Sequence, residues 1–141
     1  MLTFTNQRTL NIEWRQCDPA GIVLNGRFFE IFDQSTWELF EAALGVRRHE
    51  LAPTYDILGF PIVDVKANFA RPVKFGDRIE TISRVLEFRR SSFDVEHKIQ
   101  LDAQLAVEGV ETRIWAARDK VTGKMAAVPV PPQVIERFGG T

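Results

Sequence analysis

Cysteine is almost absent from this chain of 141 residues, and other residue types with distinctive chemistry are also rare. Cys17 is the only cysteine, so no internal disulfide bond and no cysteine-based metal site can form. Histidine occurs twice, as His49 and His97, and there is no metal-ligand spacing, phosphate-binding loop or glycine-rich dinucleotide motif. We therefore expect no metal and no bound cofactor.

Long apolar runs and an excess of one charge are also missing. No stretch is long enough to cross a bilayer, and the polar segment 1–8 lacks the apolar run of a signal peptide, which predicts a cytoplasmic protein. The formal net charge of -1 gives no general attraction to nucleic acid or to anionic membranes. A polyanionic ligand must therefore be bound by a local basic cluster.

Apolar and aromatic side chains, by contrast, are plentiful. Apolar residues make up 45% of the chain, and 11 Phe and 3 Trp against 1 Tyr indicate a core rich in rings and poor in hydroxyls. No repeat, low-complexity tract or linker interrupts the sequence. Since the length also suits one domain, we predict a single domain over residues 1–141.

The first half of the chain predicts one strand followed by one long helix. Apolar residues at near-alternate positions over 3–14 indicate a strand, and the turn-rich segment 15–25 indicates a loop. From Arg27 onward apolar residues recur every three or four positions, which predicts an amphipathic helix of about four or five turns. Asn25 is the expected N-cap of this helix, and Gly45 is its expected end.

The second half predicts antiparallel strands. A looser region with room for a short helix comes first, and apolar residues then alternate with polar ones. Gly109 is the predicted site of a β-bulge. Short connections make these strands antiparallel neighbours, so we predict an α+β fold with one long helix on a sheet of five or six strands. The later strands are expected over 63–69, 82–88, 93–101, 106–117 and, as a short last one, 125–130.

Three short motifs fall within this pattern. They are CDPAGIV at 17–23, FARPVKFGD at 69–77 and RRSSF at 89–93. The first, directly before the long helix, resembles the signature of the 4-hydroxybenzoyl-CoA thioesterase family. The second is similar to the strand-turn motif of many hotdog thioesterases, and the third resembles the nucleotide-contacting strand of the same family.

The resemblance implies a hotdog fold, in which an antiparallel sheet wraps around the long helix, and hydrolysis of an acyl-CoA thioester to free acid and CoA. Members of the family form dimers and often pair two dimers into a tetramer. Their active sites lie at the dimer interface, where one subunit supplies a carboxylate and its partner completes the pocket. We therefore expect a homodimer, paired into a homotetramer, that binds acyl-CoA but neither nucleic acid nor a membrane.

Asp18 is the predicted catalytic residue. Its carboxylate can attack a thioester carbonyl as a nucleophile or act on water as a general base. The first turn of the following helix offers free N–H groups to the carbonyl oxygen, and the resemblance places that donor at the backbone N–H of Asn25. The structural alternatives are that Asp18 only bonds its own turn and that Asn25 only caps the helix.

Substrate contacts are expected from the loop, from the segment before the second strand and from the basic hairpin. Members acting on hydroxylated aryl groups can place an aromatic hydroxyl just before the helix, where this chain has Leu24 and Asn25. This departure argues against 4-hydroxybenzoyl specificity, and we expect an aryl or medium hydrophobic acyl group. Arginines suit the CoA phosphates, with a solvated turn as the alternative. Asp33 is expected to hold the Asp18 loop or to be exposed. The predicted binding residues are Gly21, Leu24, Phe60, Arg89, Arg90 and Ser92.

Other functions fit the same motifs. A hotdog dehydratase or hydratase needs a histidine with a carboxylate at the start of the helix, where neither His49 nor His97 is expected, and we predict structural roles for both. A non-catalytic acyl-CoA-binding protein would have no use for Asp18 and would differ from an enzyme in turnover. An acyl-carrier-protein thioester is an alternative substrate, because the chemistry is the same.

Overall fold

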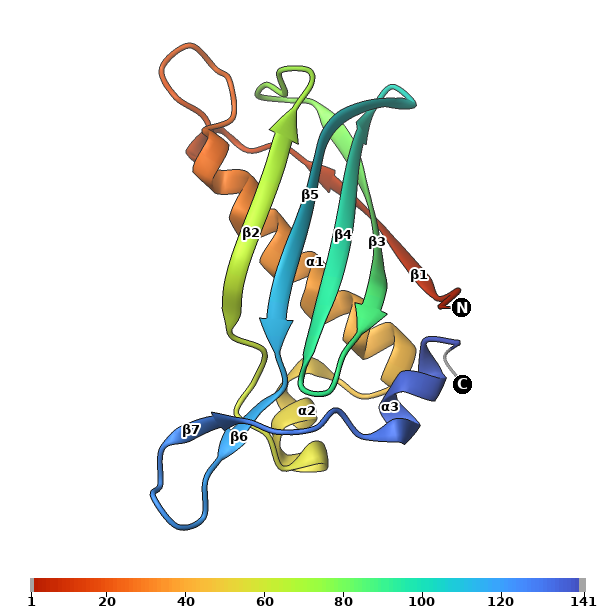
Figure 1. Cartoon of the computed structure of the whole chain (residues 1–141). Coiled ribbons are helices and arrows are strands. Elements are labelled where there is room, and N and C mark those ends of the chain that lie inside the picture. The colour runs from red at the N-terminus through yellow and green to blue at the C-terminus, as the bar shows by residue number, and fades with distance from the viewer. Residues whose placement is uncertain (1, 140–141) are drawn as a thin grey trace.

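One antiparallel sheet and one long helix form the body of the molecule, as Figure 1 shows for the computed structural model, which describes residues 2–139. The strands lie in the order β1-β3-β4-β5-β2, and a separate hairpin pairs β6 with β7. The strands are β1 Thr5–Asn11, β2 Ile62–Phe69, β3 Arg78–Phe88, β4 Ser92–Leu101, β5 Gln104–Ile114, β6 Ala116–Arg118 and β7 Met125–Ala127. The helices are the 3-10 turn η1 Trp14–Gln16, and α1 Asn25–Leu44, α2 Arg48–Tyr55 and α3 Pro132–Arg137. The predicted α+β architecture is confirmed.

Helix α1 crosses one face of the sheet and buries its apolar stripe against it (Figure 1). The helix ends at Gly45, whose φ of 68° lies in the left-handed region that suits a C-cap glycine, as predicted. The predicted N-cap is wrong by one residue: Leu24 holds the cap position with extended backbone, and Asn25 is the first helical residue. No side chain caps this end, and no acidic residue lies in the first turn.

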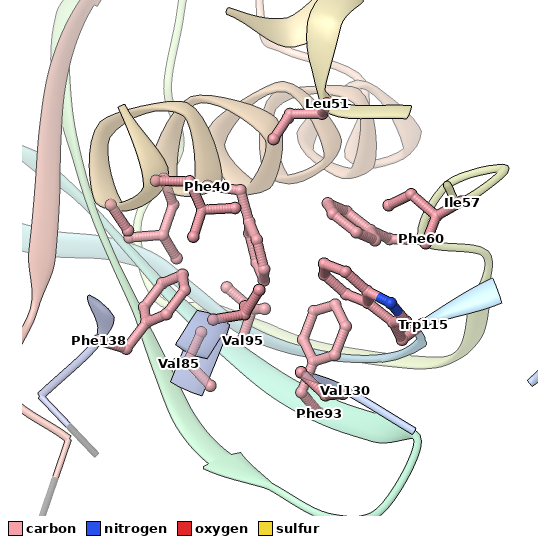
Figure 2. Packing of buried hydrophobic residues seen from close by; sticks show 14 residues of the cluster. Phe40, Leu51, Ile57, Phe60, Val85, Phe93, Val95, Trp115, Val130 and Phe138 are labelled. Carbon is pink, nitrogen blue, oxygen red and sulfur yellow. The ribbon is translucent and has the colours of Figure 1, made fainter. Parts of the chain in front are cut away.

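The core consists of two apolar clusters with a polar layer between them. Figure 2 shows the larger cluster, in which the Phe60 ring packs 5.3 Å from Trp115 and 4.6 Å from Phe40. The smaller one surrounds Phe28 and Phe32 near the start of α1. Along α1 the buried polar residues fall between the two clusters, as His97 does on β4. The buried polar side chains are Ser35, Thr36, Thr81, Ser83, His97, Glu111 and Arg113.

Two further local predictions are wrong for identifiable reasons. The first strand is shorter than 3–14, because the chain leaves the sheet after Asn11 and forms η1. The bulge lies near Ala106, since Ile99 and Gln100 on β4 pair with Val107 and Leu105, and not at Gly109. Gly109 is needed for space instead, because a Cβ there would lie 2.5 Å from the Phe32 ring.

The two edges of the sheet differ in character. β1 exposes mostly polar side chains, whereas β2 exposes Ile62, Val63 and Phe69 at 42%, 59% and 44%. β2 pairs with β5 on one side only, so its other side presents free backbone groups. Within residues 2–139, no helix is both long and apolar enough to cross a membrane.

Candidate active site

Asp18 lies on a short two-stranded ribbon that precedes α1. The Asp18 N–H donates to the Ile22 carbonyl at 2.9 Å, and the Leu24 N–H donates to the Gln16 carbonyl at 3.0 Å. Gly21 closes the turn with a φ of 80°, a left-handed conformation that glycine adopts without strain. The sequence Asp-Pro-Ala-Gly therefore forms the tight turn expected of it.

Backbone hydrogen bonds fix the ribbon against the segment that precedes β3. The Val23 N–H donates to the Val73 carbonyl at 2.8 Å, and the Phe75 N–H donates to the Gly21 carbonyl at 2.8 Å. Both valines are almost fully buried, at 3% and 1% exposure. The ribbon thus occupies a fixed place beside the first turn of α1.

The Asp18 side chain lies on the outer face of this ribbon. Residues opposite each other in an antiparallel pair share a face, and successive residues alternate between faces. Cys17 pairs with Val23, and Val23 points into the core, so Asp18 and Ile22 face outward. Ile22 and Leu24 are 42% and 46% exposed. A half-buried carboxylate beside exposed apolar side chains is a typical surrounding of a ligand site.

One oxygen of the Asp18 carboxylate bonds to its own turn. Oδ1 accepts from the Ala20 N–H at 2.8 Å and from the Ile22 N–H at 3.3 Å. Asp18 therefore does stabilise its own turn, but this role uses only one of the two carboxylate oxygens. Within residues 2–139 the second oxygen, Oδ2, accepts no hydrogen bond, and the turn fixes its orientation.

The first turn of α1 presents unpaired donors next to Asp18. The Arg27 N–H donates to the Leu24 carbonyl at 2.9 Å, whereas the N–H groups of Asn25 and Gly26 have no acceptor within the described chain. These N–H groups lie at the positive end of a 20-residue helix. The prediction named the N–H of Asn25, and the neighbouring N–H of Gly26 is likewise without an acceptor in the described chain.

A groove of about 240 Å³ opens at this helix end. Its walls come from the ribbon, from the first turn of α1 and from the segment that follows β2. Of the described residues that line it, Arg71 is the one that carries a charge. The lining residues are Ile22, Val23, Asn25, Phe28, Phe69, Ala70, Arg71, Pro72 and Val73.

A second groove, of about 390 Å³, lies beside the start of β2. Phe60, which is expected in the acyl pocket, lines this groove, although its ring is only 3% exposed and stacks on Trp37 at 4.6 Å. Asp33 lies here and accepts a hydrogen bond from Arg113, and in the described part of the chain it makes none with the Asp18 loop. The lining is otherwise mostly apolar and consists of Asp33, Trp37, Leu58, Gly59, Phe60, Pro61, Ile62, Arg113 and Met125.

Behind this groove lies a buried ionic cluster that was not predicted. Arg113 donates to Glu111 Oε2 at 2.6 Å, and His97 Nε2 lies 2.9 Å from Glu111 Oε1, which also accepts from the Thr36 hydroxyl at 2.5 Å. Burial alone raises the pKa of the Glu111 carboxyl, but the hydrogen bonds from His97 and Arg113 outweigh it and lower that pKa to about 2. Glu111 is therefore ionised at neutral pH.

The two predicted phosphate-binding arginines differ in their surroundings. Arg89 makes two bonds to Asp94, at 3.0 and 2.8 Å, and bonds Glu87 and the Ser92 hydroxyl at 3.1 and 2.9 Å. The hydrogen bond to Asp94 raises the pKa of Arg89, and the same bond lowers the pKa of Asp94. Arg90 is exposed, and its guanidinium has no carboxylate partner within residues 2–139.

The histidines lie away from the start of α1, as expected. His97 is fully buried and bonded through both ring nitrogens, to Ser83 at 2.7 Å and to Glu111 at 2.9 Å. His49 is exposed on α2, which follows the far end of α1. In the described part of the chain, no group of three or more His, Cys, Asp or Glu is placed to bind a metal ion.

Comparison with known proteins identifies thioesterases that resemble the whole chain. The 4-hydroxybenzoyl-CoA thioesterase of Pseudomonas sp. (strain CBS-3) is 30% identical over 131 residues, which are 89% of this chain and 91% of that protein. The solved structure of a 4-hydroxybenzoyl-CoA thioesterase from that strain superposes with a TM-score of 0.86 at 26% identity, over 96% of this chain and 99% of the other. A 1,4-dihydroxy-2-naphthoyl-CoA hydrolase of Synechococcus sp. (strain CC9311) is 25% identical over 86% of this chain and 82% of its own length.

These relationships confirm the predicted hotdog fold and the enzyme class, an acyl-CoA thioesterase. The model of the thioesterase-like superfamily matches residues 12–138, which include the Asp18 ribbon, α1 and the whole sheet except β1. The chain belongs to the thioesterase-like superfamily.

Proposed function

We propose that the protein hydrolyses an acyl-CoA thioester, with Asp18 as nucleophile or general base and the Asn25 N–H as donor to the carbonyl oxygen. The observation that supports this most directly is the outward Asp18 carboxylate beside a long helix whose first N–H groups are unpaired in the described chain. A carbonyl between them would meet a carboxylate at its carbon and preorganised donors at its oxygen.

Both chemical routes use the same groups. As a nucleophile, the Asp18 oxygen bonds to the acyl carbon, the C–S bond breaks, CoA leaves as a thiolate, and water then cleaves the mixed anhydride. As a general base, Asp18 takes a proton from water, whose oxygen forms the new bond to that carbon as the C–S bond breaks. In either route the negative charge develops on the carbonyl oxygen, where the donors of the first turn lie.

Pairing of β2 with its own copy would join the two grooves of this site. The edge of β2 is free and apolar, which suits a two-fold antiparallel pairing. If the two-fold axis passes through the middle of β2, such pairing places Ile62 of one copy beside Phe69 of the other. Phe69 lines the groove at Asn25, and Ile62 lines the groove at Phe60. We therefore propose that one subunit supplies Asp18 and its partner supplies the acyl pocket.

An aromatic acyl group suits that pocket. Flat aromatic walls, such as the stacked Trp37 and Phe60 rings, favour a planar group. Asp33 adds a single open carboxylate at 40% exposure, which could accept a hydrogen bond from a ring hydroxyl. Both named relatives act on hydroxylated aromatic acyl groups, and a hydroxyaryl ester is therefore our first choice over a medium-chain acyl group.

The CoA phosphates would contact the hairpin between β3 and β4. Because Arg89 already bonds Asp94 and Glu87, its charge is largely balanced within the chain. We propose that Arg90 binds phosphate and that Arg89 with Ser92 shapes the turn that presents it. Gly21 and Leu24 would contact the substrate through the ribbon and its exposed apolar face.

A panel of acyl-CoA esters tests the proposal. Purified protein should release free coenzyme thiol from 4-hydroxybenzoyl-CoA faster than from short- or medium-chain esters, and scattering should give the mass of a dimer, or a tetramer if dimers pair. Formation of an enoyl product would favour a dehydratase, for which no histidine lies at the start of α1. Tight binding without thiol release would indicate a non-catalytic binding protein.

A further inference from the structure

A chain of buried polar side chains leads from the middle of the sheet toward the Phe60 groove. Ser83 on β3 lies 2.7 Å from Nδ1 of His97 on β4, and His97 Nε2 lies 2.9 Å from Glu111 on β5. Arg113, two residues further along β5, donates to both Glu111 oxygens, at 3.2 and 2.6 Å. His97 and Glu111 are fully buried, and Arg113 is 3% exposed.

Arg113 uses its remaining donors on the two walls of the groove. Nη2 donates to Asp33 Oδ1 on α1 at 2.8 Å, and Nη1 donates to the Phe60 carbonyl at 2.8 Å. The second oxygen of Asp33, Oδ2, accepts no hydrogen bond from residues 2–139. A single guanidinium, held from behind by Glu111, thus fixes both the helix wall and the loop wall of the groove.

Stability alone does not account for this cluster. Desolvating an ion pair costs several kcal/mol per ion, and apolar replacements of similar volume are often neutral or stabilising. Yet every buried side-chain nitrogen and oxygen in the described residues has a partner, so the cluster is complete. Among residues 2–139, Asp33 and Arg113 are also the only charged residues that line the groove. The cluster therefore places charge at a ligand-facing surface that is otherwise mostly apolar.

We propose that Arg113 is a positioning residue that sets acyl selectivity. Arg113 holds the Asp33 carboxylate at the groove wall, where the open oxygen accepts a hydrogen bond from a hydroxyl on the acyl group, and it fixes the opposite wall through Phe60. This proposal rests on the proposed thioesterase function and extends it, because it assigns the acyl preference to the buried cluster behind the Phe60 groove.

The test compares two esters that differ by one hydroxyl, 4-hydroxybenzoyl-CoA and benzoyl-CoA. The ratio of their kcat/KM values is independent of the fraction of active enzyme, so a general loss of folded protein does not change it. We expect the wild type to prefer the hydroxylated ester by about tenfold or more, and Arg113→Met to bring the ratio close to one. Arg8→Met is the matched control, since Arg8 also bonds α1, through Glu38 at 2.8 Å, but does not line this groove.

Each outcome is decisive. Equal loss of kcat/KM for both esters in Arg113→Met, with the ratio kept, would assign Arg113 a purely structural role and overturn the proposal. If that variant does not fold, Glu111→Met/Arg113→Met removes both buried charges and takes its place, with the same criterion. A wild type that hydrolyses both esters equally well contradicts the selectivity proposal but leaves the thioesterase function intact. A wild type that hydrolyses neither ester, nor any other acyl-CoA, overturns both.

Discussion

Replacement of Asp18 by asparagine separates chemistry from structure at this site. The native Oδ1 accepts hydrogen bonds from the Ala20 and Ile22 N–H groups, and an asparagine Oδ1 can accept the same two bonds. The turn should therefore survive, while the negative charge that either attacks the carbonyl or deprotonates water is lost. We expect kcat to fall by about 10³-fold or more, which is about 4 kcal/mol of activation free energy, with the melting temperature nearly unchanged.

The assay is release of free coenzyme thiol from an acyl-CoA ester under saturating substrate, with thermal unfolding and ligand binding measured on the same preparation. Asp119→Asn is a matched control, because Asp119 Oδ1 also accepts from two backbone N–H groups, Val121 at 2.7 Å and Thr122 at 2.9 Å, in an exposed turn of the β6–β7 hairpin. This control should retain full activity. A kcat for Asp18→Asn within about tenfold of the wild type would exclude Asp18 from the mechanism.

Three further predictions concern the CoA contact and the core. Arg90→Ala should raise KM for acyl-CoA in a salt-dependent way with kcat unchanged, and by more than Arg89→Ala, because Arg89 is already paired with Asp94. Steady-state kinetics at two salt concentrations measure both KM values, and a larger increase for Arg89→Ala would contradict the prediction. Gly109→Ala should destabilise the fold by about 1–3 kcal/mol, because the new Cβ meets the Phe32 ring, and urea unfolding would show a neutral effect if the ring moves aside. Ionised Glu111 stabilises the fold above the ordinary carboxyl pKa of 4.5, and this contribution disappears as the pH falls to about 2. Urea unfolding between pH 6 and pH 2 should therefore show about 3 kcal/mol less acid dependence in Glu111→Gln than in the wild type.

The sequence predicted the elements of the fold better than their contacts. Apolar residues recur every three or four positions in α1 and every second position in the later strands, and Gly45 ends the helix. Such signals depend only on neighbouring residues, so they can be recognised in the sequence. The N-cap was misplaced because Asn25 has the preferred side chain for that position, whereas Leu24 adopts the extended backbone without any side-chain bond. A free first turn contradicts local capping preferences, which is expected where the N–H groups serve a ligand.

The buried cluster could not be derived from local signals. Gly109, Glu111 and Arg113 occupy every second position on the inward face of β5, and the buried Trp115 follows the strand, so the sequence does contain a hint that two charges point into the core. Their partners, however, come from β4 and α1, and the pairing depends on strand register and helix placement. For the same reason the sequence did not reveal that Arg89 pairs with Asp94, which lies on the other side of the same hairpin.

A subunit-mixing experiment can test whether the site is shared between two copies. The groove at Asn25, beside the Asp18 ribbon, and the Phe60 groove adjoin opposite ends of β2, and only pairing with a second copy would bring them together in the way we propose. Asp18→Asn removes the carboxylate, and Leu58→Trp should fill the groove, since Leu58 lines it and is 45% exposed. Each variant alone should be nearly inactive.

If the site is shared, a mixed dimer of the two variants contains one site with an intact Asp18 and an intact groove. Random mixing by co-expression or joint refolding should then restore about a quarter of the wild-type kcat per subunit, because half of the dimers are mixed and each has one intact site. If each chain used its own Asp18 with its own groove, every site in the mixture would carry one defect, and no activity would return. Absence of recovery in a preparation shown to contain mixed dimers would therefore place both groups on one chain and refute pairing through β2 as the basis of the active site.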